Sequence, residues 1–169
     1  MDELRFLESL AERIAPDEID LAPAVLQAAE DGGRAWQELL RPARGAVFGG
    51  VTGGGEVTLI AIVTDAFMVA KPVLTQLLGM LQHAANIAGV AGGLIAVREY
   101  LDRRPQSGGE LPTPVRERLE QAMALMRHRL VELGLGEERA ERLTREVLEH
   151  ACGAPAAAQG MLARIGRHE

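Results

Sequence analysis

The chain has 169 residues, of which 47% are hydrophobic and 25% are charged, so we expect one globular unit and not a disordered chain. Aromatic residues make up only 3%, and a core of Leu, Ile, Val, Ala and Met favours helix packing over an aromatic-rich β-sandwich. The net charge of −6 argues against a nucleic-acid partner, because nucleic-acid binders present a basic surface to phosphates.

The cysteine count and the N-terminal sequence indicate the cellular context. Cys152 is the single cysteine, which rules out a disulfide within the chain and fits a reducing compartment. Residues 1–14 are charged and amphipathic, and they lack the basic and apolar regions of a secretory signal. We therefore expect a cytoplasmic protein. The preference for Ala, Arg and Gly over Lys is typical of a GC-rich bacterial genome.

The first forty residues predict three helical segments. Apolar residues recur at helical spacing over residues 2–14, with charged residues on the opposite face. Pro16 ends this helix, and a second one begins near Asp20 with Pro23 in its first turn, where proline is tolerated. A short third segment surrounds Trp36.

The next segment is rich in glycine and then in β-branched residues. A glycine-rich loop is expected at about 45–55, where glycine makes positive φ angles accessible. Residues 57–64 are rich in β-branched side chains, which favours a strand, whereas the absence of any turn signal over 57–70 favours a buried helix. Few other segments offer strand partners, so we expect a helix, with short strands around 46–63 as the alternative.

Residues 72–97 form a stretch of 26 residues without Asp, Glu, Lys or Arg. It predicts a central hydrophobic helix, or one arm of a helical hairpin, with small residues in two rows at four-residue spacing. Such rows let another helix approach closely, so we expect them to be a helix-packing surface. The predicted packing residues are Ala84, Ala88, Gly89, Gly92, Gly93 and Ala96.

The C-terminal third predicts a helical hairpin and a tail. Residues 105–112 read as a linker, followed by helices at about 114–133, 137–151 and 156–166, with Gly134 as the stop signal of the first. We therefore expect an N-terminal part, residues 1–104, and a C-terminal part, residues 113–169, packed together as one unit.

No catalytic, cofactor or metal signature is recognisable. The glycine-rich segment lacks the Lys and Ser/Thr of a phosphate-binding loop and has Glu56 in their place. Cys152 and His150 are two residues apart, so a helix points them to different sides, and the four histidines lack metal-ligand spacing. We expect no enzyme, no cofactor and no small-molecule substrate.

Polar residues inside the apolar region are the remaining candidates. Asp65, Lys71 and His83 are expected to be buried polar groups, because a carboxylate in hydrocarbon requires a partner. The alternatives for Asp65 are the polar edge of a helix, a helix cap, a pair with Lys71 or a channel-lining group. His83 is a core or groove histidine, with a pH-sensitive switch as the alternative.

Two functions fit these features. The first is a helical scaffold or adaptor of a bacterial multi-protein system, which associates with itself or with another protein. The second is a membrane-active protein, of an effector or pore-forming type, that inserts residues 57–97 and so has a membrane-associated form. The number of polar residues in the segment favours the first function.

Overall fold

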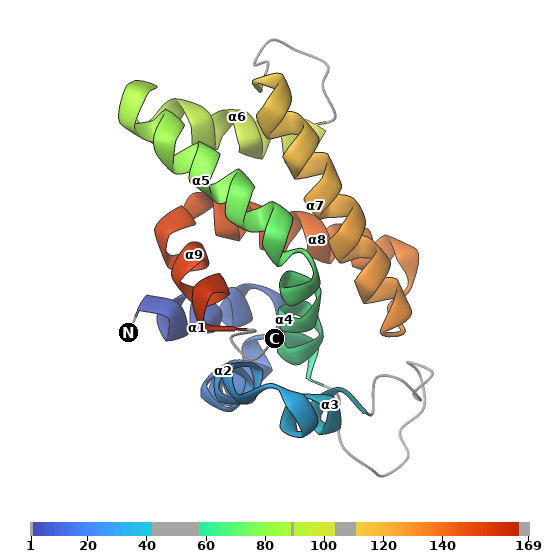
Figure 1. Ribbon diagram of the computed structural model, residues 1–169. Helices are drawn as coiled ribbons and strands as arrows, with labels where there is room; N and C mark the ends of the chain where they lie inside the picture. The colour runs from blue at the N-terminus through green and yellow to red at the C-terminus, as the bar shows by residue number, and fades with distance from the viewer. Residues whose placement is uncertain (1, 42–57, 89, 104–110, 166–169) are drawn as a thin grey trace.

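The computed structural model describes residues 2–41, 58–88, 90–103 and 111–165. Within these ranges the chain forms nine α-helices, one 3-10 helix and no strand, which confirms the prediction of a mainly α fold. The expected glycine-rich loop and most of the expected linker lie outside the described residues. Figure 1 shows the helices packed against one another as a bundle.

The N-terminal helices follow the predicted breaks closely. They are α1 (Asp2–Ile14), the 3-10 helix η1 (Pro16–Leu21), α2 (Ala22–Asp31) and α3 (Gly33–Leu40). Pro23 lies in the first turn of α2, where the missing N–H costs no hydrogen bond. Each of the three α-helices buries its apolar face and leaves its charged face to solvent, as its spacing predicts.

Helix α4 (Leu59–Val69) is the most apolar element and lies at the centre of the bundle. Each of residues 59–67 is buried, including the only carboxylate of the helix. The expected helix is therefore confirmed, and the alternative of a strand at 57–64 is wrong for residues 59–64. The sequence of α4 shows only weak helical periodicity of apolar residues. The reason is that a helix buried on all sides has no polar face.

Helices α5 (Lys71–Ala88) and α6 (Val90–Arg103) follow and pack against each other. The sequence predicted one helix over these residues, or one arm of a helical hairpin; the structure gives two helices, and residue 89 lies outside the described residues. Ala84 and Ala88 therefore belong to α5, whereas Gly92 and Ala96 belong to α6.

The C-terminal helices are α7 (Thr113–Glu132), α8 (Glu137–Gly153) and α9 (Pro155–Arg164). Gly134 ends α7 as predicted, with a φ of 98° that glycine adopts without strain. The N–H of Gly134 donates to the carbonyl of Val131, and the N–H of Leu135 donates to that of Leu130. These two bonds satisfy carbonyls that the end of a helix leaves without partners.

The two parts expected from the sequence share one hydrophobic core. Helix α7 packs against both α4 and α5, and α9 packs against α1 and α5. Leu111, within the expected linker, is itself buried. One contiguous cluster of buried side chains therefore includes residues of every α-helix.

Candidate functional site

The far ends of α5 and α6, residues 84–88 and 90–95, form what we call the arm. Figure 1 shows the arm at the edge of the molecule, extending beyond the helices of the bundle. Its side chains lie outside the described residues, so the packing roles of Ala84, Ala88, Gly89, Gly92 and Gly93 stay predictions. Ala96, at the base of the arm, is half-buried and packs against the core.

Buried apolar side chains and polar contacts hold the base of α6 to the bundle. Val97 and Leu101 are buried, and the Tyr100 hydroxyl donates to Glu120 on α7. Glu149 on α8 lies 3.4 Å from Arg98 and also 3.1 Å from Arg13 on α1. The second half of α6 is therefore fixed, while its first half belongs to the arm.

The N-terminus of α4 is capped by a residue from another element. The Glu18 carboxylate of η1 accepts from the backbone N–H groups of Leu59 and Ile60, each at 2.9 Å. Thr58 stands at the capping position, but its side chain makes no capping hydrogen bond. A carboxylate at this end also interacts favourably with the helix dipole, so Glu18 fixes the start of α4 against η1.

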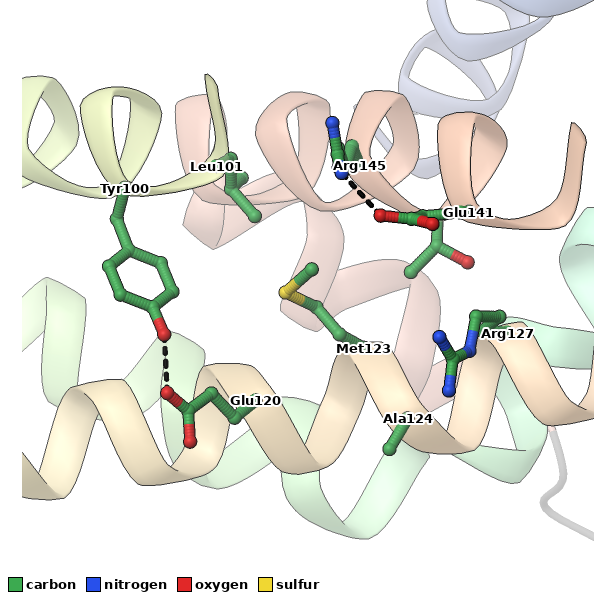
Figure 2. Close-up of a pocket in the computed structure, with 9 residues that line it drawn as sticks. Tyr100, Leu101, Glu120, Met123, Ala124, Arg127, Glu141 and Arg145 are labelled. Atoms are coloured by element: carbon green, nitrogen blue, oxygen red, sulfur yellow. Dashed lines mark hydrogen bonds and ion pairs between the residues drawn. The ribbon is translucent and has the colours of Figure 1, made fainter. Parts of the chain in front are cut away.

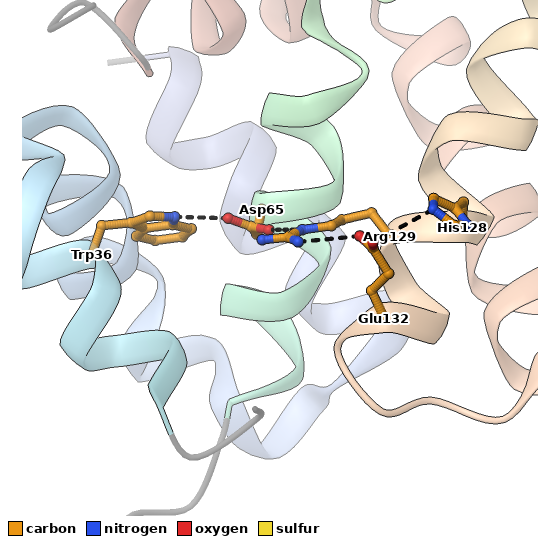
Figure 3. A network of polar contacts seen from close by, with 5 residues as sticks. All are labelled: Trp36, Asp65, His128, Arg129 and Glu132. Carbon is orange, nitrogen blue, oxygen red and sulfur yellow. Dashed lines mark hydrogen bonds and ion pairs between the residues drawn. The ribbon is translucent and has the colours of Figure 1, made fainter. Parts of the chain in front are cut away.

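Asp65 lies in the middle of α4 and has two partners, shown in Figure 3. Its Oδ1 accepts from the Trp36 indole Nε1 at 2.9 Å, and its Oδ2 accepts from Arg129 Nε at 2.6 Å. The Asp65 residue is only 6% exposed, so both oxygens are satisfied away from water. This network joins α3, α4 and α7.

The network continues from the core to the surface. Arg129 Nη1 lies 3.2 Å from Glu132, and the His128 Nε2 lies 3.5 Å from the other oxygen of Glu132. Burial lowers the pKa of Arg129, but the hydrogen bonds and charges of Asp65 and Glu132 outweigh it, so the pKa rises overall. The guanidinium therefore stays charged and balances the buried carboxylate.

The other two expected buried polar groups have different surroundings. Lys71 is half-buried, and its Nζ donates to the carbonyl of Ile165 at 2.7 Å, at the end of α9. Pairing of Asp65 with Lys71 is thus wrong, because the lysine satisfies a helix C-terminus instead. His83 is exposed rather than buried, because it lies on the face of α5 opposite Leu81.

Cys152 and His150 do not form a reactive pair. Burial raises the pKa of the Cys152 thiol to about 12, so the nucleophilic thiolate is not formed near neutral pH. Burial lowers the pKa of His150, whose Nε2 lies 3.4 Å from the Phe6 carbonyl oxygen. In the described ranges no group of three or more His, Cys, Asp or Glu side chains is placed to hold a metal ion.

The length and the apolar character of the helices determine whether any of them could span a membrane. Among the described residues no single helix is both long and apolar enough to cross a bilayer. Helix α4 and residues 71–83 of α5 meet these requirements only as a pair, bent by 79° at their junction. The residues of α4 in this pair are mostly buried against other helices.

Two residues that contact α4 could not be predicted from the sequence. Glu18 and Arg129 lie 41 and 64 residues from their partners on α4, so no local spacing indicates either contact. Comparison of the chain with protein-family models, with curated proteins and with solved structures gives no significant match. The case for a function therefore depends on the residues themselves.

Proposed function

We propose that this protein is a helical scaffold or adaptor that associates with a second copy of itself through the arm. One observation carries the proposal. Residues 72–97 contain no Asp, Glu, Lys or Arg, and the part of this stretch in the arm extends beyond the bundle. An uncharged, glycine- and alanine-rich helix pair at the edge of a molecule suits close packing against another helix pair.

The rest of the molecule supports this division of roles. Glu18, the Trp36–Asp65–Arg129 network and Lys71 fix α4 and the start of α5 to four other elements. The core therefore holds the root of the arm in place and leaves its far end for a partner. A rigid base reduces the conformational entropy lost when the arm binds.

Light scattering after size-exclusion chromatography tests the proposal. The wild-type chain of 18.1 kDa is expected to elute as a dimer or larger species. Ala88→Lys is expected to yield a monomer with unchanged helix content, because it places a charge in the arm and a cation is tolerated near a helix C-terminus. Ala35→Lys is the matched control, since Ala35 is exposed on α3, at the opposite end of the molecule from the arm.

The results that count against self-association are clear. A wild-type chain that stays monomeric at high concentration contradicts it, as does an equal loss of mass in both lysine variants. Gly92→Leu provides a second test. If this variant and the wild-type chain are both monomers and melt at the same temperature, the arm is not a packing surface.

A membrane-active protein is the second candidate, and the bent pair of α4 and α5 favours it. Insertion requires α4 to leave its buried site and lose the contacts of Glu18 and Asp65. Co-sedimentation of the wild-type chain with liposomes supports this candidate. Retention of the chain in the supernatant, at neutral and at acidic pH, contradicts it and leaves the scaffold proposal in place.

A further inference from the structure

A pocket of about 260 Å³ lies where α6, α7 and α8 meet, and it is separate from the arm and from the Asp65 network. Figure 2 shows that its wall combines apolar and charged side chains from the three helices. Its size is just below the roughly 300–1,000 Å³ of sites for drug-sized ligands, so it suits a smaller molecule. The residues that line it are Tyr100, Leu101, Glu120, Met123, Ala124, Arg127, Glu141, Thr144 and Arg145.

Two polar pairs fix the shape of the pocket. The Tyr100 hydroxyl donates to Glu120, and Arg145 pairs with Glu141 one helical turn away. Burial, together with the Glu120 carboxylate, raises the pKa of Tyr100 to about 12, so the phenol stays protonated. Between these pairs lie the apolar side chains of Leu101 and Met123.

Arg127 is the lining cation that has no partner among the described residues. No ion pair or hydrogen bond joins its guanidinium to another part of the described chain. In Figure 2 Arg127, Arg145 and Glu141 lie at one end of the pocket, and Glu120 lies at the other end beside Tyr100. Two guanidinium groups thus face one carboxylate at the first end, which leaves one net positive charge there.

The wall also contains a polar group that the chain does not satisfy. Thr144 is 1% exposed, and its hydroxyl has no hydrogen-bond partner in the part of the chain that the structure describes. Thr64, a buried threonine of α4, instead donates to the carbonyl of Ile60 at 2.7 Å, as threonines in helices commonly do. A buried hydroxyl without a partner is unfavourable, so this wall has a hydrogen-bonding group left over for another molecule.

We propose that this pocket binds a small organic acid, whose carboxylate meets Arg127 and whose apolar body lies against Met123 and Leu101. A guanidinium binds a carboxylate through two parallel hydrogen bonds, which is the strongest pairing these side chains offer. The anionic head belongs at the Arg127 end, because the Glu120 carboxylate at the other end repels it. The apolar body replaces water over the thioether and the leucine.

Titration with benzoate, followed by amide chemical shifts, tests this site. Benzoate is expected to shift residues of all three lining helices, whereas neutral benzamide and cationic benzylamine bind at least tenfold more weakly. Arg127→Gln is expected to weaken benzoate binding at least tenfold. Arg142→Gln is the matched control, since Arg142 is exposed on α8 and does not line the pocket, and it is expected to bind benzoate as the wild-type chain does.

A second variant blocks the pocket without altering its charge. Ala124 is exposed, so Ala124→Phe is expected to keep the fold, fill the pocket and abolish benzoate binding. Shifts confined to other surfaces, equal binding by the Arg127 and Arg142 variants, or tighter binding of benzylamine than of benzoate would each overturn the proposal. So would the absence of binding by benzoate in a wild-type chain with its native spectrum.

Discussion

Asp65 and Arg129 form a buried ion pair, so the stability cost of a substitution at one position depends on the residue at the other. Removal of one partner from a buried ion pair leaves an uncompensated charge, which typically costs about 3–5 kcal/mol. Replacement of both charges is far less costly, because no group remains unpaired. The Arg129 side chain is 23% exposed, so we expect the lower end of that range for its loss.

We therefore predict that Arg129→Met lowers the free energy of unfolding by about 3 kcal/mol. Adding Asp65→Asn to this variant is expected to restore more than about 1 kcal/mol, because the amide is neutral and its oxygen still accepts from Trp36. Urea unfolding followed by Trp36 fluorescence measures both effects. Arg142→Met, at an exposed arginine, is the control and is expected to change stability by less than about 0.5 kcal/mol. A double variant no more stable than Arg129→Met would show that the buried charge is not the cause.

At the scale of elements, the N-terminus of α4 is capped by a residue of another element. The N–H groups of Leu59 and Ile60 have no partner within their own helix, and Glu18 supplies one for each. Glu18→Ala is expected to lower the free energy of unfolding by about 1–2 kcal/mol, as the loss of a helix cap does. Asp17→Ala removes a neighbouring exposed carboxylate and serves as the control, with little change expected. Equal effects of the two variants in thermal unfolding would contradict the capping role.

The elements also show what the sequence can and cannot predict. The helix ends at Pro23 and Gly134 were predicted because each depends on the backbone of one residue. The partner of Asp65 was not predicted, since Arg129 lies on a helix that only tertiary packing brings near. The division of the small-residue rows between α5 and α6 was not predicted, because the four-residue repeat of small side chains continues from one range to the next. The pocket was also missed, because its lining residues come from three separate helices.

At the scale of the whole molecule, the core joins helices from both ends of the sequence. Helix α7 covers α4 and α5, and Leu119 and Met126 of α7 are fully buried in the shared cluster. Neither the N-terminal part, residues 1–104, nor the C-terminal part, residues 113–169, can bury its apolar faces alone. We therefore expect one cooperative unfolding transition for the chain.

Two natural probes test this cooperativity without any label. Trp36 is the single tryptophan and lies in α3, whereas Cys152 is the single cysteine and lies buried in α8. Trp36 fluorescence and the reactivity of the Cys152 thiol are expected to report the same urea midpoint. Leu119→Ala is expected to shift both midpoints together, with a loss of about 2–5 kcal/mol, because it leaves a cavity in the shared core. Separate midpoints, or a shift in the Cys152 signal alone, would show that the two parts unfold independently.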